Sequence, residues 1–111
     1  MKAETYVVAR IIAAINTAPH TFVWRNQSGS VRAPGGYVHM APAGSPDVVG
    51  WTRGKFLGIE VKVEGNRTSK ERAAKQAEWR ERIRAAGGIA FEARSAQEAV
   101  DLLRAALGEA A

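Results

Sequence analysis

In the segment of residues 56–63, FLGIEVKV, apolar and charged residues alternate from Ile59 onward, which is the pattern of a β-strand. Its β-branched members are Ile59, Val61 and Val63, and charged residues stand between them. Successive side chains of a β-strand point to opposite faces, so Glu60 and Lys62 would share one face and the apolar residues the other. We therefore predict a strand over 56–63 with one apolar face and one charged face.

Periodicity and turn signals place the other elements around this strand. Apolar residues three and four positions apart predict a helix over 3–17, which Pro19 ends. Short β-branched and aromatic segments predict strands at 21–25, 47–51 and 89–94. The Thr-x-x-Glu pattern at 68–71 predicts a helix that runs to about residue 86, and the Ser-x-x-Glu pattern at 95–98 predicts a last helix. We expect residues 26–36 to form a loop, and the sequence leaves 37–40 undecided.

The resulting element order, α-β-β-β-α-β-α, predicts the fold class. Short strands interspersed with helices are expected to form a small mixed sheet of four strands flanked by helices, an α/β fold. The length of 111 residues, with no repeat and no linker, predicts one domain over 1–111. No apolar run approaches the ~20 residues that span a bilayer. The absence of cysteine fits a reducing compartment.

Basic residues concentrate in one part of the chain. The formal net charge is +5, and residues 62–84 hold a net +4 of it. The basic residues of this segment are Lys62, Arg67, Lys70, Arg72, Lys75, Arg80, Arg82 and Arg84. A localised basic surface is typical of proteins that bind polyanions. A solvated helix face with ion pairs is the alternative that the pattern leaves open.

Two acidic residues on consecutive predicted strands suggest a metal site. Strand pairing would bring Asp47 close to Glu60, and Mg²⁺ or Mn²⁺ prefers carboxylate oxygens completed by waters and a carbonyl. The main-chain carbonyl of Val61 is the expected third protein ligand. Such an ion polarises a phosphoryl oxygen, and the Lys62 ammonium would stabilise charge that grows on the phosphate. The pattern therefore predicts metal-dependent phosphodiester hydrolysis.

Two polar residues stand on helix faces that should be buried. Gln76 shares a face with Trp79 and Ile83, and Glu4 shares one with Val8. A buried amide without partners costs ~1–3 kcal/mol, so Gln76 needs a reason to point inward. The alternatives are a position at the rim for Gln76 and a first-turn interaction with the helix dipole for Glu4. The presence of Asp47 and Glu60 favours a place in the site for both.

The motifs in their order carry a family resemblance. They are the N-terminal helix with Glu4, WRNQSG at 24–29, GSPDVVG at 44–50, GIEVK at 58–62, Gln76 with Trp79, and AGG at 86–88. The chain resembles the stand-alone phage and bacterial type of the VRR-Nuc (virus-type replication-repair nuclease) family, a branch of the PD-(D/E)XK nucleases. The segment between Lys62 and Gln76 is slightly longer than is common in that family.

The resemblance implies a restriction-endonuclease-like fold and a role for each site residue. Asp47 and Glu60 would be metal ligands, and Lys62 the catalytic lysine. Gln76 would lie near the scissile phosphate, and Glu4 would be the carboxylate that the first helix supplies to the site.

The resemblance also implies partners and a cofactor. Stand-alone members are homodimeric, structure-selective nucleases that cut four-way (Holliday) DNA junctions with Mg²⁺ or Mn²⁺. A cytoplasmic location in a bacterium or a phage-infected cell would follow. Two alternatives remain open: a non-catalytic basic module that binds nucleic acid, and a nuclease subunit that needs a replication or repair partner.

Other residues carry weaker expectations. Arg25 and Asn26, at the end of a strand beside a Ser/Gly loop, are predicted to contact phosphate, as is Lys70 of the basic segment. A turn-initiating role is the alternative for Asn26. We expect Trp24 and Trp51 to be core or dimer-interface residues rather than residues that stack on bases.

Overall fold

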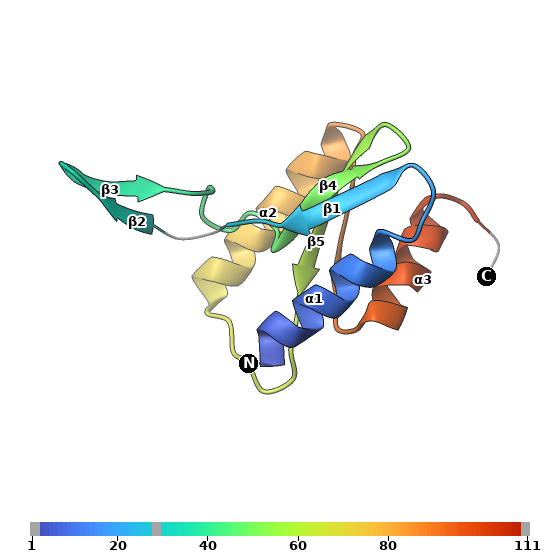
Figure 1. Cartoon of the computed structure of the whole chain (residues 1–111), viewed down its shortest axis with the longest axis horizontal. Helices are drawn as coiled ribbons and strands as arrows, with labels where there is room; N and C mark the ends of the chain where they lie inside the picture. Colours follow the sequence, from blue (N-terminus) through green and yellow to red (C-terminus); the bar gives the residue numbers. More distant parts are fainter. Residues whose placement is uncertain (1–2, 28–29, 110–111) are drawn as a thin grey trace.

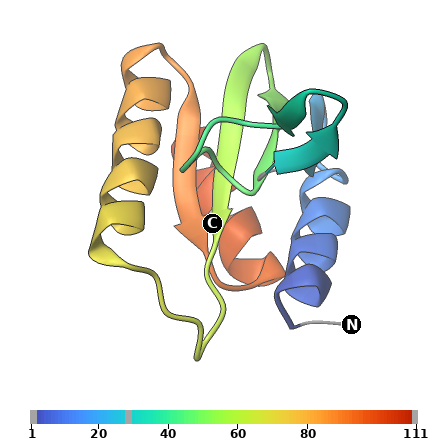
Figure 2. The same ribbon diagram turned by 90° about the vertical axis from the view of Figure 1, so that its left-hand side faces the viewer.

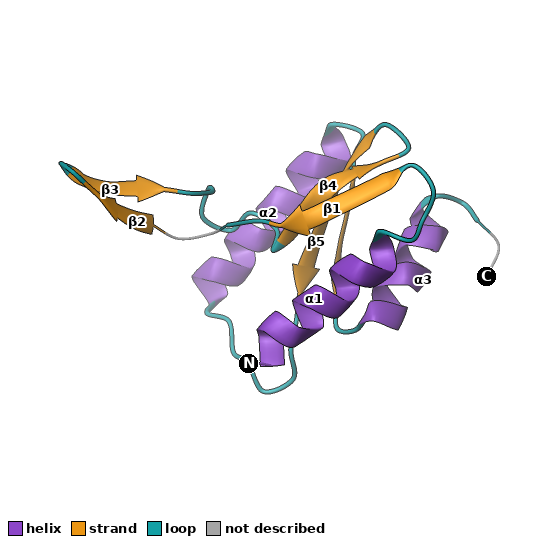
Figure 3. Cartoon of the chain, in the orientation of Figure 1, coloured by secondary structure: helices purple, strands orange, loops and turns teal. Residues whose placement is uncertain are grey.

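The computed structural model describes residues 3–27 and 30–109 and has a mixed α/β fold, as predicted. Its helices are α1 (Ala3–Ile15), α2 (Lys70–Ala85) and α3 (Ala96–Ala106), and no helix within the described ranges is long and apolar enough to cross a membrane. Its strands are β1 (Thr21–Arg25), β2 (Ser30–Ala33), β3 (Gly36–His39), β4 (Val48–Thr52), β5 (Lys55–Val61) and β6 (Ile89–Ala93) (Figure 3).

The main sheet has four strands in the order β1-β4-β5-β6. Strand β4 pairs antiparallel with both β1 and β5, and β6 pairs parallel with β5. Parallel neighbours need a long crossover connection, which here contains α2. Strand β5 is therefore an inner strand that has a neighbour on each side, and it carries both Glu60 and the apolar residues around it.

Helices cover the sheet on both faces (Figures 1 and 2). Helix α2 lies on one face over β5 and β6, and α1 and α3 pack on the other face and against each other. The core between the sheet and the α1/α3 layer includes Val8, Ile11, Ile15, Val23, Leu57, Ile59, Val61, Phe91 and Leu103. Burial of these apolar side chains is the main stabilising contribution. The opposite face of β5, which carries Gly58 and Glu60, lies under α2.

Gly58 allows α2 to approach the sheet closely. A Cβ atom at this position would lie 2.8 Å from Cγ of Pro46 and 3.0 Å from Cδ1 of Ile83, both closer than normal carbon contacts. Ile83 and Gln76 are the buried residues of α2, so the predicted inward face of this helix is confirmed. The missing side chain at Gly58 thus lets α2 bring Gln76 down onto the next residue of the same strand face, Glu60.

The predicted elements agree with the observed ones to within one or two residues at their ends, but the start of α2 differs in its cap. The Oγ of Ser69 accepts the N–H of Arg72, so Ser69 rather than Thr68 caps the helix. Both residue types cap well, so the local sequence does not choose between them. At α3 the predicted cap is confirmed, because the Oγ of Ser95 accepts the N–H of Glu98.

The prediction of a loop over 26–36 is wrong in part. Strands β2 and β3 pair with each other and form a separate two-stranded sheet that projects from the body of the protein (Figure 1). The turn between them contains Pro34 followed by Gly35 at φ +87°. Proline followed by a residue with positive φ is the pattern of a type II turn. The two strands have only four residues each, which is too short for alternation to identify them.

Of the two places expected for Trp24 and Trp51, the core is excluded, and a position at a dimer interface stays a prediction. Both side chains are nearly half exposed on the α2 side of the sheet, where the helix covers β5 and β6 and leaves β1 and β4 open. The sequence did not indicate which strands of the sheet α2 would cover, and therefore which aromatic side chains would stay exposed.

Candidate functional site

The two predicted metal ligands meet because of the register between β4 and β5. Val48 pairs with Ile59, which places Asp47, just before β4, beside the end of β5. The Oδ2 atom of Asp47 accepts the N–H of Val61 at 2.8 Å. This hydrogen bond ties the carboxylate to the strand that carries Glu60. The predicted convergence of Asp47 and Glu60 is therefore present in the fold.

Asn26 holds the loop that precedes Asp47. Its side-chain amide donates to Oγ of Ser45 and to the carbonyl of Pro46, each at 2.9 Å, and its backbone N–H donates to the carbonyl of Asp47 at 2.7 Å. These three bonds fix the path of the chain into β4. Asn26 thus positions the site, and a contact of Asn26 with phosphate stays a prediction.

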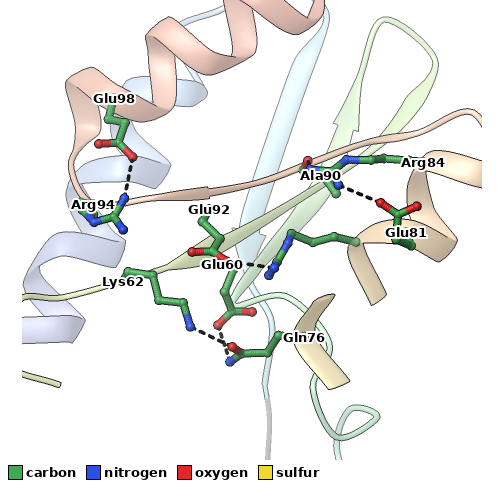
Figure 4. Close-up of polar contacts among 10 residues, drawn as sticks. Glu60, Lys62, Gln76, Glu81, Arg84, Ala90, Glu92, Arg94 and Glu98 are labelled. Atoms are coloured by element: carbon green, nitrogen blue, oxygen red, sulfur yellow. Dashed lines mark hydrogen bonds and ion pairs between the residues drawn. The ribbon is translucent and has the colours of Figure 1, made fainter. Parts of the chain in front are cut away.

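Gln76 joins the glutamate to the lysine (Figure 4). Its Nε2 donates to Oε1 of Glu60 at 3.0 Å, and its Oε1 accepts the Nζ of Lys62 at 2.8 Å. Glu60 and Gln76 are each only 4% exposed. The amide therefore has a partner at both ends, which removes the cost of burying it. The position at the rim considered for Gln76 is excluded.

The environment of Glu60 opposes its ionisation. Burial, a hydrogen bond with the Asp47 carboxyl and the negative charge of Asp47 raise the pKa of Glu60 from 4.5 to about 9, against the opposing effect of Lys62 and Arg72. Burial disfavours the charged form of any carboxyl, and a second carboxylate nearby adds repulsion. In the protein without a cation Glu60 therefore retains its proton near neutral pH.

The donor set fits a hard divalent cation. Gln76 and the Val61 N–H each engage one oxygen of a carboxyl group, which leaves the other oxygen of Glu60 and of Asp47 for a proton or a cation. The N–H and C=O of one residue in a strand point to the same side, so the Val61 carbonyl lies on the side of Asp47. Two carboxylate oxygens, one carbonyl and water are the ligands that Mg²⁺ accepts.

A third acidic ligand is not available at this position. Within residues 3–27 and 30–109, no three His, Asp or Glu side chains gather closely enough to hold an ion by themselves. Glu92 is the β6 partner of Glu60, but its carboxylate is paired with Arg80 at 2.9 Å. A bound cation would therefore keep open positions for water and substrate, as catalytic metal sites do.

The site opens into a cleft of about 410 Å³ at the carboxyl end of β5. Its lining includes the predicted residues Glu4, Asp47, Glu60, Val61, Lys62 and Gln76, together with Asn66, Arg67, Thr68 and Arg72. Helix α1, strand β5 and helix α2 thus all contribute to one surface. The structure brings Glu4 to this cleft, as the interruption of its apolar stripe predicted, without making it part of an acidic metal cluster.

Sequence reasoning missed two arginines of the cleft. Arg67 and Arg72 line it, whereas Lys70, which we singled out, is an exposed residue at the start of α2 outside the lining. The excess of basic residues after Lys62 was visible in the sequence. Which of these side chains point into the cleft depends on where α2 begins. Arg25 lies outside the lining too, where its guanidinium approaches Oγ1 of Thr5 at 3.5 Å. Contacts of Arg25 and Lys70 with nucleic acid stay predictions.

The arrangement combines three chemical capacities in one cleft: a pair of carboxyl groups that can bind a cation, an ammonium group held in place by an amide, and two guanidinium groups at the rim. Positive groups of this kind stabilise a phosphate. In comparisons with known proteins, no family model matches the chain and no curated protein matches it.

Proposed function

We propose that this protein is a divalent-metal-dependent DNA endonuclease that hydrolyses phosphodiester bonds. The observation that carries the proposal is the hydrogen-bonded chain from Lys62 through Gln76 to Glu60, which lies beside Asp47 in a cleft rimmed by arginines. A buried carboxyl group whose pKa is strongly raised beside a second carboxylate is unfavourable for stability alone and is typical of functional sites.

Asp47, Glu60 and the Val61 carbonyl would hold Mg²⁺ or Mn²⁺. When bound, such an ion supplies a Lewis acid for a phosphoryl oxygen and lowers the pKa of a coordinated water. Lys62 directs its ammonium group into the cleft and stabilises negative charge that grows on the phosphate. Gln76 fixes the positions of Lys62 and Glu60. Glu4 adds a carboxylate at the wall formed by α1.

Arg67 and Arg72 provide the contact with the DNA backbone. They line the same cleft, and a guanidinium group binds phosphate through paired N–H donors. As part of the proposal, a homodimer acts on branched DNA, including four-way junctions, because a two-fold dimer would present two clefts to the two strands of a symmetric branch. The resemblance to the VRR-Nuc nucleases is the support for this part.

A cleavage panel tests the proposal. Labelled four-way, flapped, linear duplex and single-stranded DNA is incubated with purified protein and Mg²⁺, Mn²⁺ or a chelator. We expect cleavage of branched DNA with either metal, none with the chelator, and none by Asp47→Asn. The matched control is Asp101→Asn, an exposed residue of α3 that should cut normally.

Titration of Mn²⁺ by calorimetry separates ligand loss from misfolding. Asp47→Asn should lose heat of Mn²⁺ binding while its circular dichroism spectrum is unchanged. DNA binding without cleavage under every metal would contradict the proposal and favour a non-catalytic binding module. Cleavage that requires an added replication or repair protein would show a subunit dependent on a partner.

A further inference from the structure

The face of the sheet beside α2 carries an unusual concentration of exposed aromatic residues. Phe22, Trp24, Trp51 and Phe56 project from the sheet there, and the partly exposed Trp79 of α2 borders them, so all three tryptophans and two of the three phenylalanines of the chain gather at this place. We call these five residues the aromatic face. The four that belong to the sheet are 45–49% exposed. Single exposed apolar residues are ordinary, but a contiguous patch marks a surface that binds something.

The aromatic face is continuous across three strands. Phe22 pairs with Trp51, and Trp51 pairs with Phe56, so the three side chains project from the same side of the sheet. The ring centroids of Phe22, Trp24 and Trp51 are 5.7–6.2 Å apart. Helix α2 covers β5 and β6 on this side, which leaves the surface of β1 and β4 open next to the helix.

A groove of about 410 Å³ forms the end of this face where the sheet meets the last turns of α2. Phe56 and Trp79 are its aromatic residues, Ile83 is among its apolar ones, and Lys55 and Arg82 are its cations. The Arg82 guanidinium lies over the Trp79 ring at 4.9 Å. None of the described residues that line the groove is acidic. The groove therefore joins flat aromatic surface to positive charge.

Strand β1 forms one edge of the sheet, and a side chain blocks this edge against pairing with an additional strand. The Asn16 side chain donates from Nδ2 to the carbonyl of Val23 at 3.1 Å and accepts the Val23 N–H at Oδ1, 2.8 Å away. It thereby occupies the outward backbone groups at the middle of β1. An occupied edge opposes pairing with the strand of another protein. A ligand must instead lie on the aromatic face itself.

We propose that the aromatic face and its groove bind the unpaired bases of single-stranded nucleic acid. Successive bases stack on the exposed rings, and Lys55 and Arg82 contact the backbone phosphates. Aromatic platforms with flanking cations are how proteins hold single strands without reading their sequence. A second copy of this chain fits less well, because an isologous contact would bring like cations together without opposing carboxylates.

This surface also has a defined relation to the candidate active site. Phe56 and Glu60 project from the same face of β5 and are four residues apart, which corresponds to ~13 Å along the strand. If the protein is the proposed nuclease, its substrate would contain a single-stranded segment that binds the aromatic face; this part of the inference rests on the proposed function. Binding itself requires neither the metal nor an intact Asp47, so it is tested separately from cleavage.

Tryptophan fluorescence in a chelating buffer gives the test, because every tryptophan of the chain is part of the aromatic face. The probe is an oligothymidylate of about 16 nucleotides, the upper end of site sizes on single small folds. We expect it to quench the fluorescence of the wild type and of Asp47→Asn equally. A duplex of the same length should bind more weakly.

Two variants and two matched controls locate the site. Phe56→Ala keeps all three tryptophans and should weaken binding by about 5- to 150-fold, the range for loss of one stacking ring. Arg82→Gln should weaken binding and flatten its salt dependence. The controls are Tyr6→Ala, an exposed aromatic residue of α1, and Arg94→Gln, an exposed cation near α3; neither should change binding.

Three results would overturn the proposal. Unquenched fluorescence with the oligonucleotide is one, and equal affinity of Phe56→Ala and wild type is another. The third comes from sedimentation of the protein without DNA. If the wild type is a dimer and Trp51→Ala is a monomer, a second copy covers this face and nucleic acid does not bind it.

Discussion

Gln76 donates a hydrogen bond to Glu60 across 3.0 Å, and this bond links helix α2 to strand β5 inside the protein. Both side chains are almost completely buried. The oxygen of the same amide accepts a hydrogen bond from the Lys62 ammonium, so the positions of a carboxyl group and an ammonium group in the cleft depend on how α2 packs on the sheet. Stability and site geometry are therefore coupled through one residue.

Replacing Gln76 tests that coupling. Gln76→Ala leaves Glu60 and Lys62 without their shared partner, so we expect the free energy of unfolding to fall by about 1–3 kcal/mol. Urea denaturation followed by circular dichroism measures it. The control is Gln97→Ala, whose exposed amide donates to Asp101 in α3 and whose loss should cost at most about 0.5 kcal/mol. Equal effects of the two substitutions would show that the buried bridge adds no stability.

Lys62→Ala should abolish cleavage while much of the DNA binding remains. The reason is that Arg67, Arg72 and the other basic residues keep their positions when this one ammonium is removed. Cleavage and electrophoretic mobility assays on the same branched DNA measure the two properties. Lys75→Ala is the matched control, because Lys75 is an exposed lysine of α2 outside the cleft lining. Undiminished nicking by Lys62→Ala would remove this residue from the mechanism.

The raised pKa of Glu60 predicts a pH dependence of stability in the metal-free protein. Because the folded-state pKa is about 9 and the ordinary value 4.5, the folded protein binds the proton more tightly than the unfolded chain. The stabilisation that arises from this tighter proton binding by Glu60 is fully present below pH 4.5, and it is lost as the pH rises toward about 9. Urea denaturation in chelator should therefore show a decline over this range that Glu60→Gln lacks.

Divalent metal should reverse that decline. A cation competes with the proton for the carboxyl pair, so Mn²⁺ should stabilise the wild type more at the alkaline end of the range than at the acidic end. The comparison is the shift of the urea midpoint with and without Mn²⁺ at each pH. A shift of the same size in Glu60→Gln would place the bound metal elsewhere.

The close contact at Gly58 predicts a rescue experiment. Gly58→Ala places a methyl group against Cγ of Pro46 and Cδ1 of Ile83, and overpacking of this kind costs about 1–3 kcal/mol. It should also weaken cleavage, since α2 carries Gln76. Ile83→Val removes the clashing atom on the helix while Pro46 remains, so the double variant should recover part of the loss in both measurements, beyond the sum of the single effects. Purely additive effects would mean that the strand, not the helix, yields to the added methyl group.

Local patterns predicted most of this fold because they arise from interactions close in the sequence. Apolar spacing identified α1, and β-branched runs identified β1, β4, β5 and β6 nearly to the residue. The β2/β3 hairpin was missed because its apolar residues Val31, Tyr37 and Val38 are exposed rather than packed in the core, and because each strand has only four residues. The cap of α2 shifted by one residue because Thr68 and Ser69 are both good caps.

The sequence alone determined five residues of the candidate site. Glu4 and Gln76 stood on helix faces that should be apolar, Glu60 and Lys62 shared the charged face of one strand, and Asp47 began the neighbouring strand; all five line one cleft. Only the tertiary structure decided which arginines join them and which aromatic residues stay exposed. The physical reason is that α2 covers two strands of the sheet and leaves two bare, and that choice depends on packing between segments distant in the chain, such as Gly58 against Ile83.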